Sequence, residues 1–417
     1  MGLYDKTEKA GAHKKGLFAT YFTAWLVLAL AIFSATPPAL SAGAPDNPGR
    51  GVKIALVLPL SGPFASIGER VLDGAGLAQS FLAKDGLNAQ VRAVDTGEPG
   101  WLEELAGLPG DVAVIGGPIR PDMFRLLYAA GQQRKRAVFA FTSSLDKARE
   151  GVEAWRFFAA PEDQARALIR TAMDEFGVRN FGVLHPDEDY GRRMAELFTN
   201  QAKTMGAAIA ARKSYPPDNP LEWRARVKDL LDQAARAGLP LGAVFLPDGW
   251  PQAEMLAPSF YYFGQEHLLL MGSNLWGETL SQGMNVSERI FRLSFFPSAW
   301  TPANKSFAAR ELGSALSRTR GRAEPGLWEA LGFDFVRFAV RLGPLSPGWT
   351  PELVNERVVS AQNMDWSMAP LFWNDQRQVS QNLFLLTPAK GGKVPADIPG
   401  IKERRRQSML RKRVGGE

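Results

Sequence analysis

The sequence predicts an α/β protein with two doubly wound parallel sheets, one in each of two lobes. Short apolar runs of strand length alternate along the chain with longer segments whose apolar residues recur at helical spacing. The junctions between these segments are short and contain Gly or Pro. The chain has 417 residues, of which 45% are hydrophobic, so it is long enough for two domains with separate cores.

The most regular stretch runs from Val52 to Ala78. The run Ile54–Pro59 is too short for a helix and too continuous for a half-exposed strand, so we expect a strand buried on both faces. Residues 59–63 contain two prolines, a serine and a glycine, which predict a tight turn. Apolar residues at helical spacing from Ile67 to Leu82 predict a helix that packs back on the strand.

Three further runs predict strands of the same sheet, at 90–95, 112–115 and 137–141. Each is followed by small or polar residues, and Pro121 begins a helix because proline is common at the first helical position. In parallel sheets, ligands bind at the carboxyl ends of the strands. These turns therefore predict one ligand-binding edge.

The alternation continues in the second lobe. Helices are predicted at 165–176, 192–205, 221–237 and 252–262, and strands at 181–184, 242–246, 268–271 and 290–296. Gly177, Gly206 and Gly238 end three of these helices, as glycine commonly does. The pattern predicts a second doubly wound sheet.

After Pro297 the chain is expected to return to the first lobe, with helices at 306–318, 327–342 and 351–360. Segments 371–373 and 383–386 predict a hairpin in the second lobe. We therefore assign residues 52–160 and 297–365 to lobe 1, and residues 161–296 and 366–389 to lobe 2. Crossings near Pro161 and Pro297 would form a multi-strand hinge.

The two ends of the chain carry the positive charge. Of the net charge of +6, residues 1–42 contribute +2 and residues 402–417 contribute +5, which leaves −1 for the body and no basic patch typical of nucleic-acid binding. Lysines, an apolar run at 17–35 and small residues up to Ala42 predict a signal peptide, with an uncleaved membrane anchor as the alternative. The chain has no cysteine, so we expect no lipoprotein. The basic segment 390–417 has no apolar periodicity and is expected to be disordered, with weak contact to anionic surfaces.

The stretch PLSGPFASIG followed by VLDGAGLA resembles the opening signature of the type I periplasmic binding proteins, the family of the leucine/isoleucine/valine-binding protein. The resemblance extends to about Ala389. Asp187–Gly191 resembles the D-x-x-Y-G element that opens the family's second lobe, and Gly332–Asp334 resembles its G-Y-D helix. The resemblance implies two lobes that close around a ligand on a multi-strand hinge, and a periplasmic location.

Two elements resemble a narrower branch, the penicillin-binding protein activators: LPDG at Leu246–Gly249 and G-x-N-L-W at Gly272–Trp276. The family resemblance implies a solute-binding protein that delivers a small polar, amino-acid-like ligand to the permease of an ABC importer. The branch resemblance implies the alternative, a regulator of peptidoglycan synthesis that binds a penicillin-binding protein through its surface.

The candidate ligand-binding residues of the first lobe are Ser61, Phe64, Arg120, Thr142 and Ser143. The hydroxyls could bind a ligand carboxylate or cap the following helices. Arg120 could pair with an anionic group or lie solvated at the rim. The family often has a serine where Ile119 or Arg120 stands in this chain, so the departure argues against a simple branched-chain amino acid ligand.

The candidate residues of the second lobe are Tyr190, Asp248 and Trp276. Tyr190 could close over the ligand or pack at the lobe boundary. Asp248 could receive an ammonium group or serve as a turn residue before Gly249. Trp276, with Trp250, could form an apolar wall or lie buried.

No pattern predicts an enzyme, a metal site or a cofactor. The carboxylates at 187–189 lack the remaining ligands of a calcium loop and the separation of an acid/base pair. Ser144–Lys147 matches S-x-x-K without the accompanying S-D-N and K-T-G elements. None of the three histidines is paired at metal-ligand spacing.

Overall fold

The structure, a computed structural model, describes residues 51–280, 284–320 and 324–414. Met1–Pro48 and Gly49–Glu417 are separate units, and the described residues belong to the second. The predicted signal peptide, residues 1–42, lies outside the described residues. Within the described part of the chain, no helix combines the length and apolar character needed to cross a membrane.

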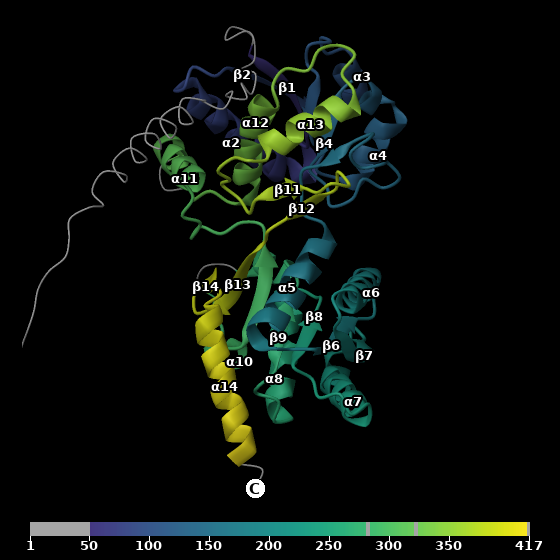
Figure 1. Ribbon diagram of the computed structural model, residues 1–417, viewed down its shortest axis with the longest axis vertical. Coiled ribbons are helices and arrows are strands. Elements are labelled where there is room, and N and C mark those ends of the chain that lie inside the picture. Colours follow the sequence, from purple (N-terminus) through teal and green to yellow (C-terminus); the bar gives the residue numbers. More distant parts are fainter. Residues whose placement is uncertain (1–50, 281–283, 321–323, 415–417) are drawn as a thin grey trace, which may run out of the picture. The chain divides into compact units, whose positions relative to one another are not determined.

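The first lobe is built on a parallel sheet of order β2-β1-β3-β4-β5 (Figure 1). Its strands are β1 Val52–Leu58, β2 Ala89–Asp95, β3 Val114–Gly116, β4 Ala137–Ala140 and β5 Trp155–Arg156. β1 pairs in register with both neighbours, so that Ile54 lies opposite Val91 and Val114. The central strand is almost wholly buried, as its continuous apolar run predicts.

Two apolar cores cover the faces of this sheet. The larger contains side chains of α2, α11, α12, α13 and the hairpin formed by β11 Leu371–Trp373 and β12 Val379–Gln381, and the smaller contains those of α3 and α4. The helical elements are η1 Gly62–Phe64, α2 Ala65–Ala83, α3 Trp101–Ala106, α4 Pro121–Ala129, η2 Gln132–Arg134, α11 Phe307–Arg320, α12 Leu327–Leu342 and α13 Pro351–Ala361.

Helices α2 and α12 approach each other so closely that two positions admit only glycine. A Cβ on Gly332 would lie 1.9 Å from the Val71 carbonyl oxygen, and one on Gly74 would lie 2.0 Å from that of Glu329. Beside this contact, Arg70 Nε donates to Glu329 Oε1 at 2.7 Å. The glycine of the G-Y-D-like element therefore marks a close helix crossing.

The second lobe contains a sheet of order β14-β13-β10-β9-β8-β6-β7. The five strands from β10 to β7 are parallel, and β13 and β14 extend the sheet in antiparallel fashion. The strands are β6 Asn180–Pro186, β7 Ala208–Tyr215, β8 Ala243–Leu246, β9 Leu269–Gly272, β10 Ser294–Ser298, β13 Phe384–Ala389 and β14 Gly392–Pro395.

Helices also cover both faces of this second sheet. One core contains side chains of α7, α8 and α10, and the other contains those of α5 and α6. The helical elements are α5 Pro161–Phe176, α6 Asp189–Thr204, η3 Pro220–Glu222, α7 Trp223–Arg236, α8 Trp250–Tyr262, α9 Leu275–Thr279, α10 Glu288–Phe291 and α14 Ile398–Val414. The predicted fold class, two wound α/β lobes, is confirmed.

The chain passes between the elements of the two sheets at three places. These are the links from β5 to α5, from β10 to α11, and from the hairpin strand β12 Val379–Gln381 to β13. Pro161 is the first residue of α5, and Pro297 lies within β10.

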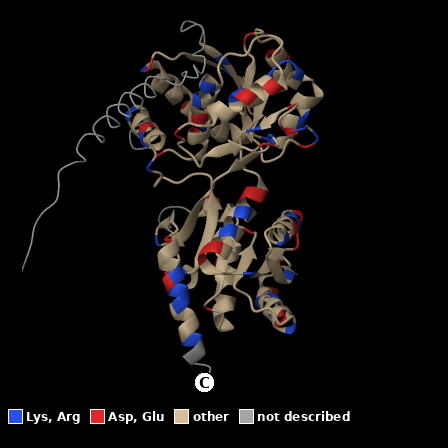
Figure 2. Cartoon of the chain, viewed as in Figure 1, with Lys and Arg blue, Asp and Glu red and all other residues tan. Residues whose placement is uncertain are grey.

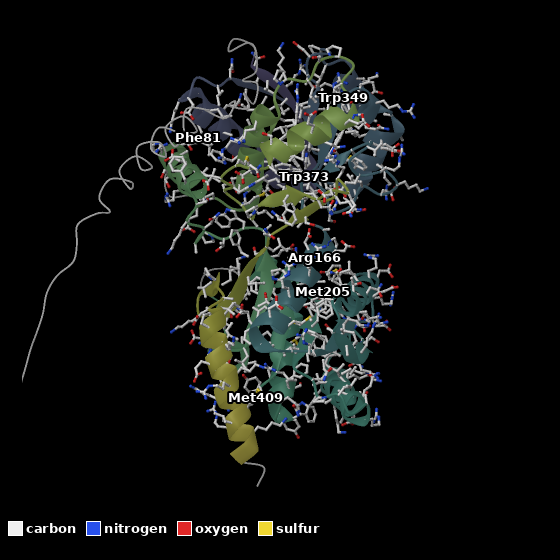
Figure 3. All side chains as sticks on the ribbon, in the orientation of Figure 1. Phe81, Arg166, Met205, Trp349, Trp373 and Met409 are labelled. Carbon is white, nitrogen blue, oxygen red and sulfur yellow. The ribbon has the colours of Figure 1, made fainter. Side chains whose placement is uncertain are left out.

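The assignment of residues 366–389 to the second lobe is wrong for its first part. β11 Leu371–Trp373 pairs with β12, not with residues 383–386, and Trp366, Leu371 and Val379 belong to the core of the first lobe. Trp373, which is labelled in Figure 3, lies on the first lobe. Its ring stacks on that of Phe338 of α12, with ring centroids 5.3 Å apart. Aromatic packing thus holds the hairpin on the first lobe.

Two elements of the second lobe differ from the sequence prediction. β7 was not predicted, because it is an edge strand whose half-exposed Arg212 and Lys213 hide the apolar alternation. The predicted strand at 290–296 is the helix α10 followed by β10, which begins at Ser294.

The prediction of a disordered tail is also wrong, because residues 398–414 form α14, whose basic residues are visible in Figure 2. Ile398 and the buried Ile401 pack against the core of the second lobe, and polar contacts hold the rest of this helix. The Arg405 guanidinium donates to the carbonyl oxygens of Phe176, His267 and Gly242 at 2.9, 3.2 and 3.4 Å. The free carbonyl groups at the C-terminus of α5 favour a nearby cation such as Arg405. Because this contact is polar, the spacing of apolar residues in the sequence does not predict it.

Candidate functional site

The turns that follow β1 and β2 are joined by the carboxylate of Asp95. Its Oδ1 accepts hydrogen bonds from the backbone N–H groups of Leu60, Ser61 and Gly97 at 2.7, 3.2 and 2.8 Å. Burial raises the pKa of Asp95, but the bonds from Gly97, Leu60 and Ser61 outweigh it and hold the pKa below its usual value. Ser61 is thereby fixed at the carboxyl edge of the first sheet.

Phe64 and Arg120 lie together at the same edge. The Arg120 guanidinium carbon is 4.7 Å from the centroid of the Phe64 ring, which is 41% exposed. Arg120 Nε donates to Asp122 Oδ1 at 3.0 Å, and Nη2 donates to Asp122 Oδ2. This bidentate contact with Arg120 holds the pKa of Asp122 below its usual value. A ligand that binds Arg120 must therefore compete with Asp122 for its guanidinium group.

Thr142 and Ser143 follow β4 and differ in exposure. Thr142 is buried, and its hydroxyl donates to the Ser144 carbonyl oxygen at 2.6 Å, so it stabilises the loop. Ser143 is exposed and lines a cavity. Ser143 is therefore the better placed of the two to meet a ligand.

The carboxyl edge of the second sheet brings Tyr190 and Asp248 together with Tyr215. Tyr215 ends β7, and its hydroxyl donates to Asp248 Oδ2 at 2.5 Å, while the Gly249 N–H donates to Oδ1 at 2.6 Å. Burial raises the pKa of Asp248 despite these two bonds. The pKa of Tyr190 is raised by burial first, and the Glu278 and Asp248 carboxylates add to the shift. Tyr215 was not predicted as a site residue, because the strand β7 that ends with it was not predicted.

The structure places Trp276 in the core instead of on a ligand-binding wall. Trp276 and Trp250 are both fully buried, with ring centroids 5.7 Å apart. A Cβ on Gly272 would lie 2.1 Å from the Trp276 ring, so the glycine leaves room for the indole. The spacing of G-x-N-L-W is thus a packing requirement, and we remove Trp276 from the candidate site.

A polar cavity of about 450 Å³ lies where β5 leads into α5. It is lined by the loop after β4, the first turn of α5 and the β11–β12 turn, and Arg156 and Arg166 lie in its wall (Figure 3 labels Arg166). The sequence did not single out either arginine. Neither follows a strand of the predicted ligand edge, and only the folded chain brings them together.

A model of the family described as periplasmic binding protein matches residues 51–392. The chain belongs to the periplasmic binding protein family. No curated protein matches the sequence.

Several solved structures have the same fold as this chain. A putative branched-chain amino acid ABC transporter from Rhodospirillum rubrum aligns with a TM-score of 0.64 at 17% identity, covering 83% of this chain and all of that one. An ABC transporter substrate-binding protein from Desulfitobacterium hafniense in complex with Leu aligns with a TM-score of 0.60 at 16% identity, covering 83% of this chain and 100% of that one. The C-domain of LpoA from Haemophilus influenzae, a regulator of PBP1A, aligns with a TM-score of 0.59 at 17% identity, covering 82% of this chain and 99% of that one. Binding proteins and a regulator thus share this fold.

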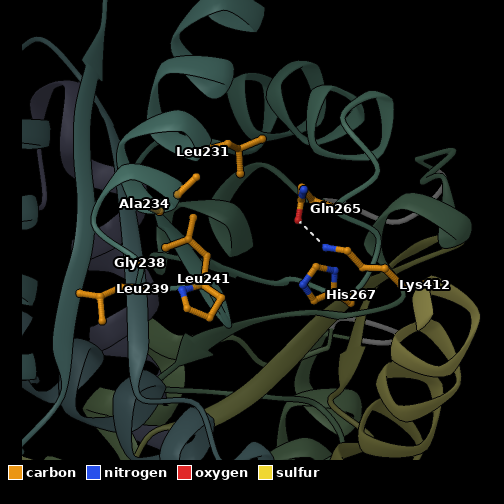
Figure 4. Close-up of a pocket in the computed structure, with 10 residues that line it drawn as sticks. Leu231, Ala234, Gly238, Leu239, Leu241, Gln265, His267 and Lys412 are labelled. Carbon is orange, nitrogen blue, oxygen red and sulfur yellow. Dashed lines mark hydrogen bonds between the residues drawn. The ribbon is translucent and has the colours of Figure 1, made fainter. Parts of the chain in front are cut away.

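A second cavity, of about 370 Å³, lies beside the opposite edge of the second sheet, at residues that precede β8 and β9 (Figure 4). Leu231, Leu239 and Leu241 line it, and Lys412 donates to Gln265 at 3.3 Å across it. Burial, and then the nearby Lys412 and Arg405 cations, lower the pKa of His267 to about 4. Within the described ranges, no group of three or more His, Cys, Asp or Glu residues could hold a metal ion.

Proposed function

We propose that this chain is an exported, non-enzymatic solute-binding protein of the periplasm. It captures a small polar ligand, with an amino acid as the first candidate, between its lobes and presents it to the permease of an ABC importer. The observation that carries the proposal is the set of polar groups at the carboxyl edges of both sheets. Ser61, Arg120 and Ser143 at one edge suit a carboxylate, and Asp248 with Tyr190 at the other suits an ammonium group.

The three chain crossings support this proposal, because hinge closure needs few connections between two compact lobes. The descriptions of similar structures as ABC transporter components, one of them in complex with Leu, agree with it.

The alternative is a regulator that binds a penicillin-binding protein through its surface, as the likeness to the LpoA C-domain suggests. An exposed apolar stripe on α8 favours it. The stripe consists of Pro251, Met255, Pro258 and Tyr262, of which Met255 is 56% and Tyr262 70% exposed. Exposed apolar stripes commonly mark protein interfaces.

A thermal-shift screen of the full chain against amino acids, short peptides and muropeptides separates the two functions. A solute at 100 times its Kd should add about 2.7 kcal/mol to the free energy of unfolding. An amino acid that gives such a shift supports the importer function. Failure of every solute, together with capture of a purified penicillin-binding protein that Met255→Asp abolishes, would replace it with the regulator.

A further inference from the structure

The polar cavity between the first lobe and α5, which we call the junction cavity, contains a buried cation with an unused donor. Arg156 is 9% exposed. Its Nε donates to the carboxylate oxygens of Glu150 at 3.1 and 3.0 Å, and its Nη2 donates to the Val379 carbonyl at 3.1 Å. Its Nη1 is buried and has no hydrogen-bond partner among the described residues. An unpaired buried donor is unfavourable, so an acceptor supplied from the cavity would be stabilised there.

A second cation and a helix terminus lie in the same wall. Arg166 is one-third exposed, and its Nη1 donates to Asp163 Oδ1 at 2.7 Å and to the Ser380 hydroxyl at 3.2 Å. Ala160 and Glu162, at the start of the sixteen-residue helix α5, also line the cavity. The N-terminus of a helix attracts anions through its free N–H groups and its dipole. These groups favour a ligand oxygen with negative charge.

The carboxylates of the cavity divide into two pairs. Glu150 and Asp163 are occupied, because Glu150 holds Arg156 and Asp163 accepts from the Ala160 N–H at 2.9 Å and from Arg166. Asp146 and Glu162 are exposed and form no ion pair within the described part of the chain. These two carboxylates add a negative region that would repel a simple anion and attract an ammonium group.

The loops around the cavity are held in a defined shape. Asp146 and Arg377, with φ of 52° and 66°, are the non-glycine residues with positive φ in the described ranges, and they lie in the two loops that wall the cavity. A Cβ on Gly151 would lie 2.3 Å from the Arg377 Cβ, so these loops are in close contact. Such conformations persist where the surrounding structure enforces them.

We propose that the junction cavity binds a small zwitterion at a site that shares only Ser143 with the strand edges described above. The anionic group lies between Arg156, Arg166 and the Ser143 hydroxyl, and the ammonium group faces Asp146 and Glu162. The inference does not rest on the importer function, since a solute receptor and a regulator could both carry this site. Because the β5–α5 link and the strand β12 border the cavity, its ligand lies beside one of the three segments that pass between the sheets and beside the strand from which another begins.

Isothermal titration calorimetry of the full chain tests the inference with probes of matched size. The probes are ω-amino acids of increasing length, succinate with two carboxylates, and 1,4-diaminobutane with two ammonium groups. One ω-amino acid should bind at millimolar concentration or below, and more tightly than succinate or the diamine. Arg166→Gln should weaken that binding about tenfold, since it removes a charge-assisted hydrogen bond. Arg170→Gln, on the same exposed side one turn later in α5, is the matched control and should leave binding unchanged.

Two further variants decide where the probe binds. Glu162→Gln should weaken the ω-amino acid and leave succinate unchanged or tighter, because only the ammonium group loses its partner. Asp248→Asn, at the second strand edge, should leave the probe's affinity unchanged. The inference is overturned if no probe binds, if Arg166→Gln and Arg170→Gln behave alike, or if Asp248→Asn alone abolishes binding. An α-amino acid that binds independently of Arg166 leaves the solute-binding proposal intact while this site is rejected.

Discussion

The carboxyl edges of the two sheets occupy equivalent places in their lobes but differ in their electrostatics. At the first edge, Asp95 is surrounded by three backbone N–H donors, which hold its pKa below the usual value. At the second edge, Asp248 has one N–H and one hydroxyl donor, and burial raises its pKa. The number of donors, weighed against burial, decides the sign of the shift. Asp95 is therefore satisfied internally, whereas Asp248 would gain from a cationic ligand group.

The largest difference between the edges should appear when an aromatic residue is removed from each. Trp276→Ala empties a fully buried site behind the second edge and should lower the free energy of unfolding by about 3–5 kcal/mol. Phe64→Ala, at an exposed position of the first edge, should change it by less than about 1 kcal/mol. Urea denaturation measures both. Similar losses would show that Phe64 is also part of a core.

Removal of the edge carboxylates should give the next largest effect. Asp95→Ala leaves three N–H groups without their acceptor and should destabilise by about 1–3 kcal/mol. Asp248→Asn keeps an acceptor for Tyr215 and removes a partly buried charge, so its effect should stay below about 1 kcal/mol. Urea denaturation measures both changes. Equal losses in the free energy of unfolding for the two variants would contradict the proposed difference between Asp95 and Asp248.

The pH dependence of unfolding should have opposite signs at the two edges. The pKa of Asp95 is lowered in the folded state, so its contribution is present above the unfolded pKa, about 3.9, and is lost as the pH falls further. The pKa of Asp248 is raised, so its contribution is present below the unfolded pKa and is lost as the pH rises through the folded value. Unfolding measured from pH 3 to 7 should show a shallower acid loss for Asp95→Ala and a steeper one for Asp248→Asn. The same change of slope in both variants would disprove the assignment.

The smallest effect on stability is expected for Arg120→Gln. Exposed ion pairs contribute about 0–1 kcal/mol, so loss of the contacts with Asp122 and Phe64 should scarcely move the midpoint of unfolding. If Arg120 binds the ligand carboxylate, the same variant should weaken solute binding about tenfold in calorimetry. Unchanged affinity would remove Arg120 from the site and leave Ser61 and Ser143 to hold the carboxylate.

Several parts of the fold and the site could be predicted from the sequence because their cause is local. The continuous apolar run of β1 and the apolar spacing of α2 identify a buried strand and the helix that covers it. The positions of Asp95 at the end of β2 and of Ser61 in the turn after β1 follow directly, since a parallel sheet brings the carboxyl ends of its strands to one edge. The likeness of 51–392 to the periplasmic binding protein family agrees with this local reading.

Other features depended on contacts between distant segments. The hairpin at 371–381 packs on the first lobe through aromatic contacts, and α14 is held by hydrogen bonds from Arg405 to backbone carbonyl groups. Neither kind of contact produces a regular spacing of apolar residues in the sequence. The sequence spacing of Trp276 is compatible with a position in a cleft or in a core. Its complete burial beside Trp250 shows that it belongs to the core. Arg156 and Arg166 meet only where a strand leads into a helix. Local periodicity thus determined the elements, whereas burial and long-range pairing decided which polar side chains remain available to a ligand.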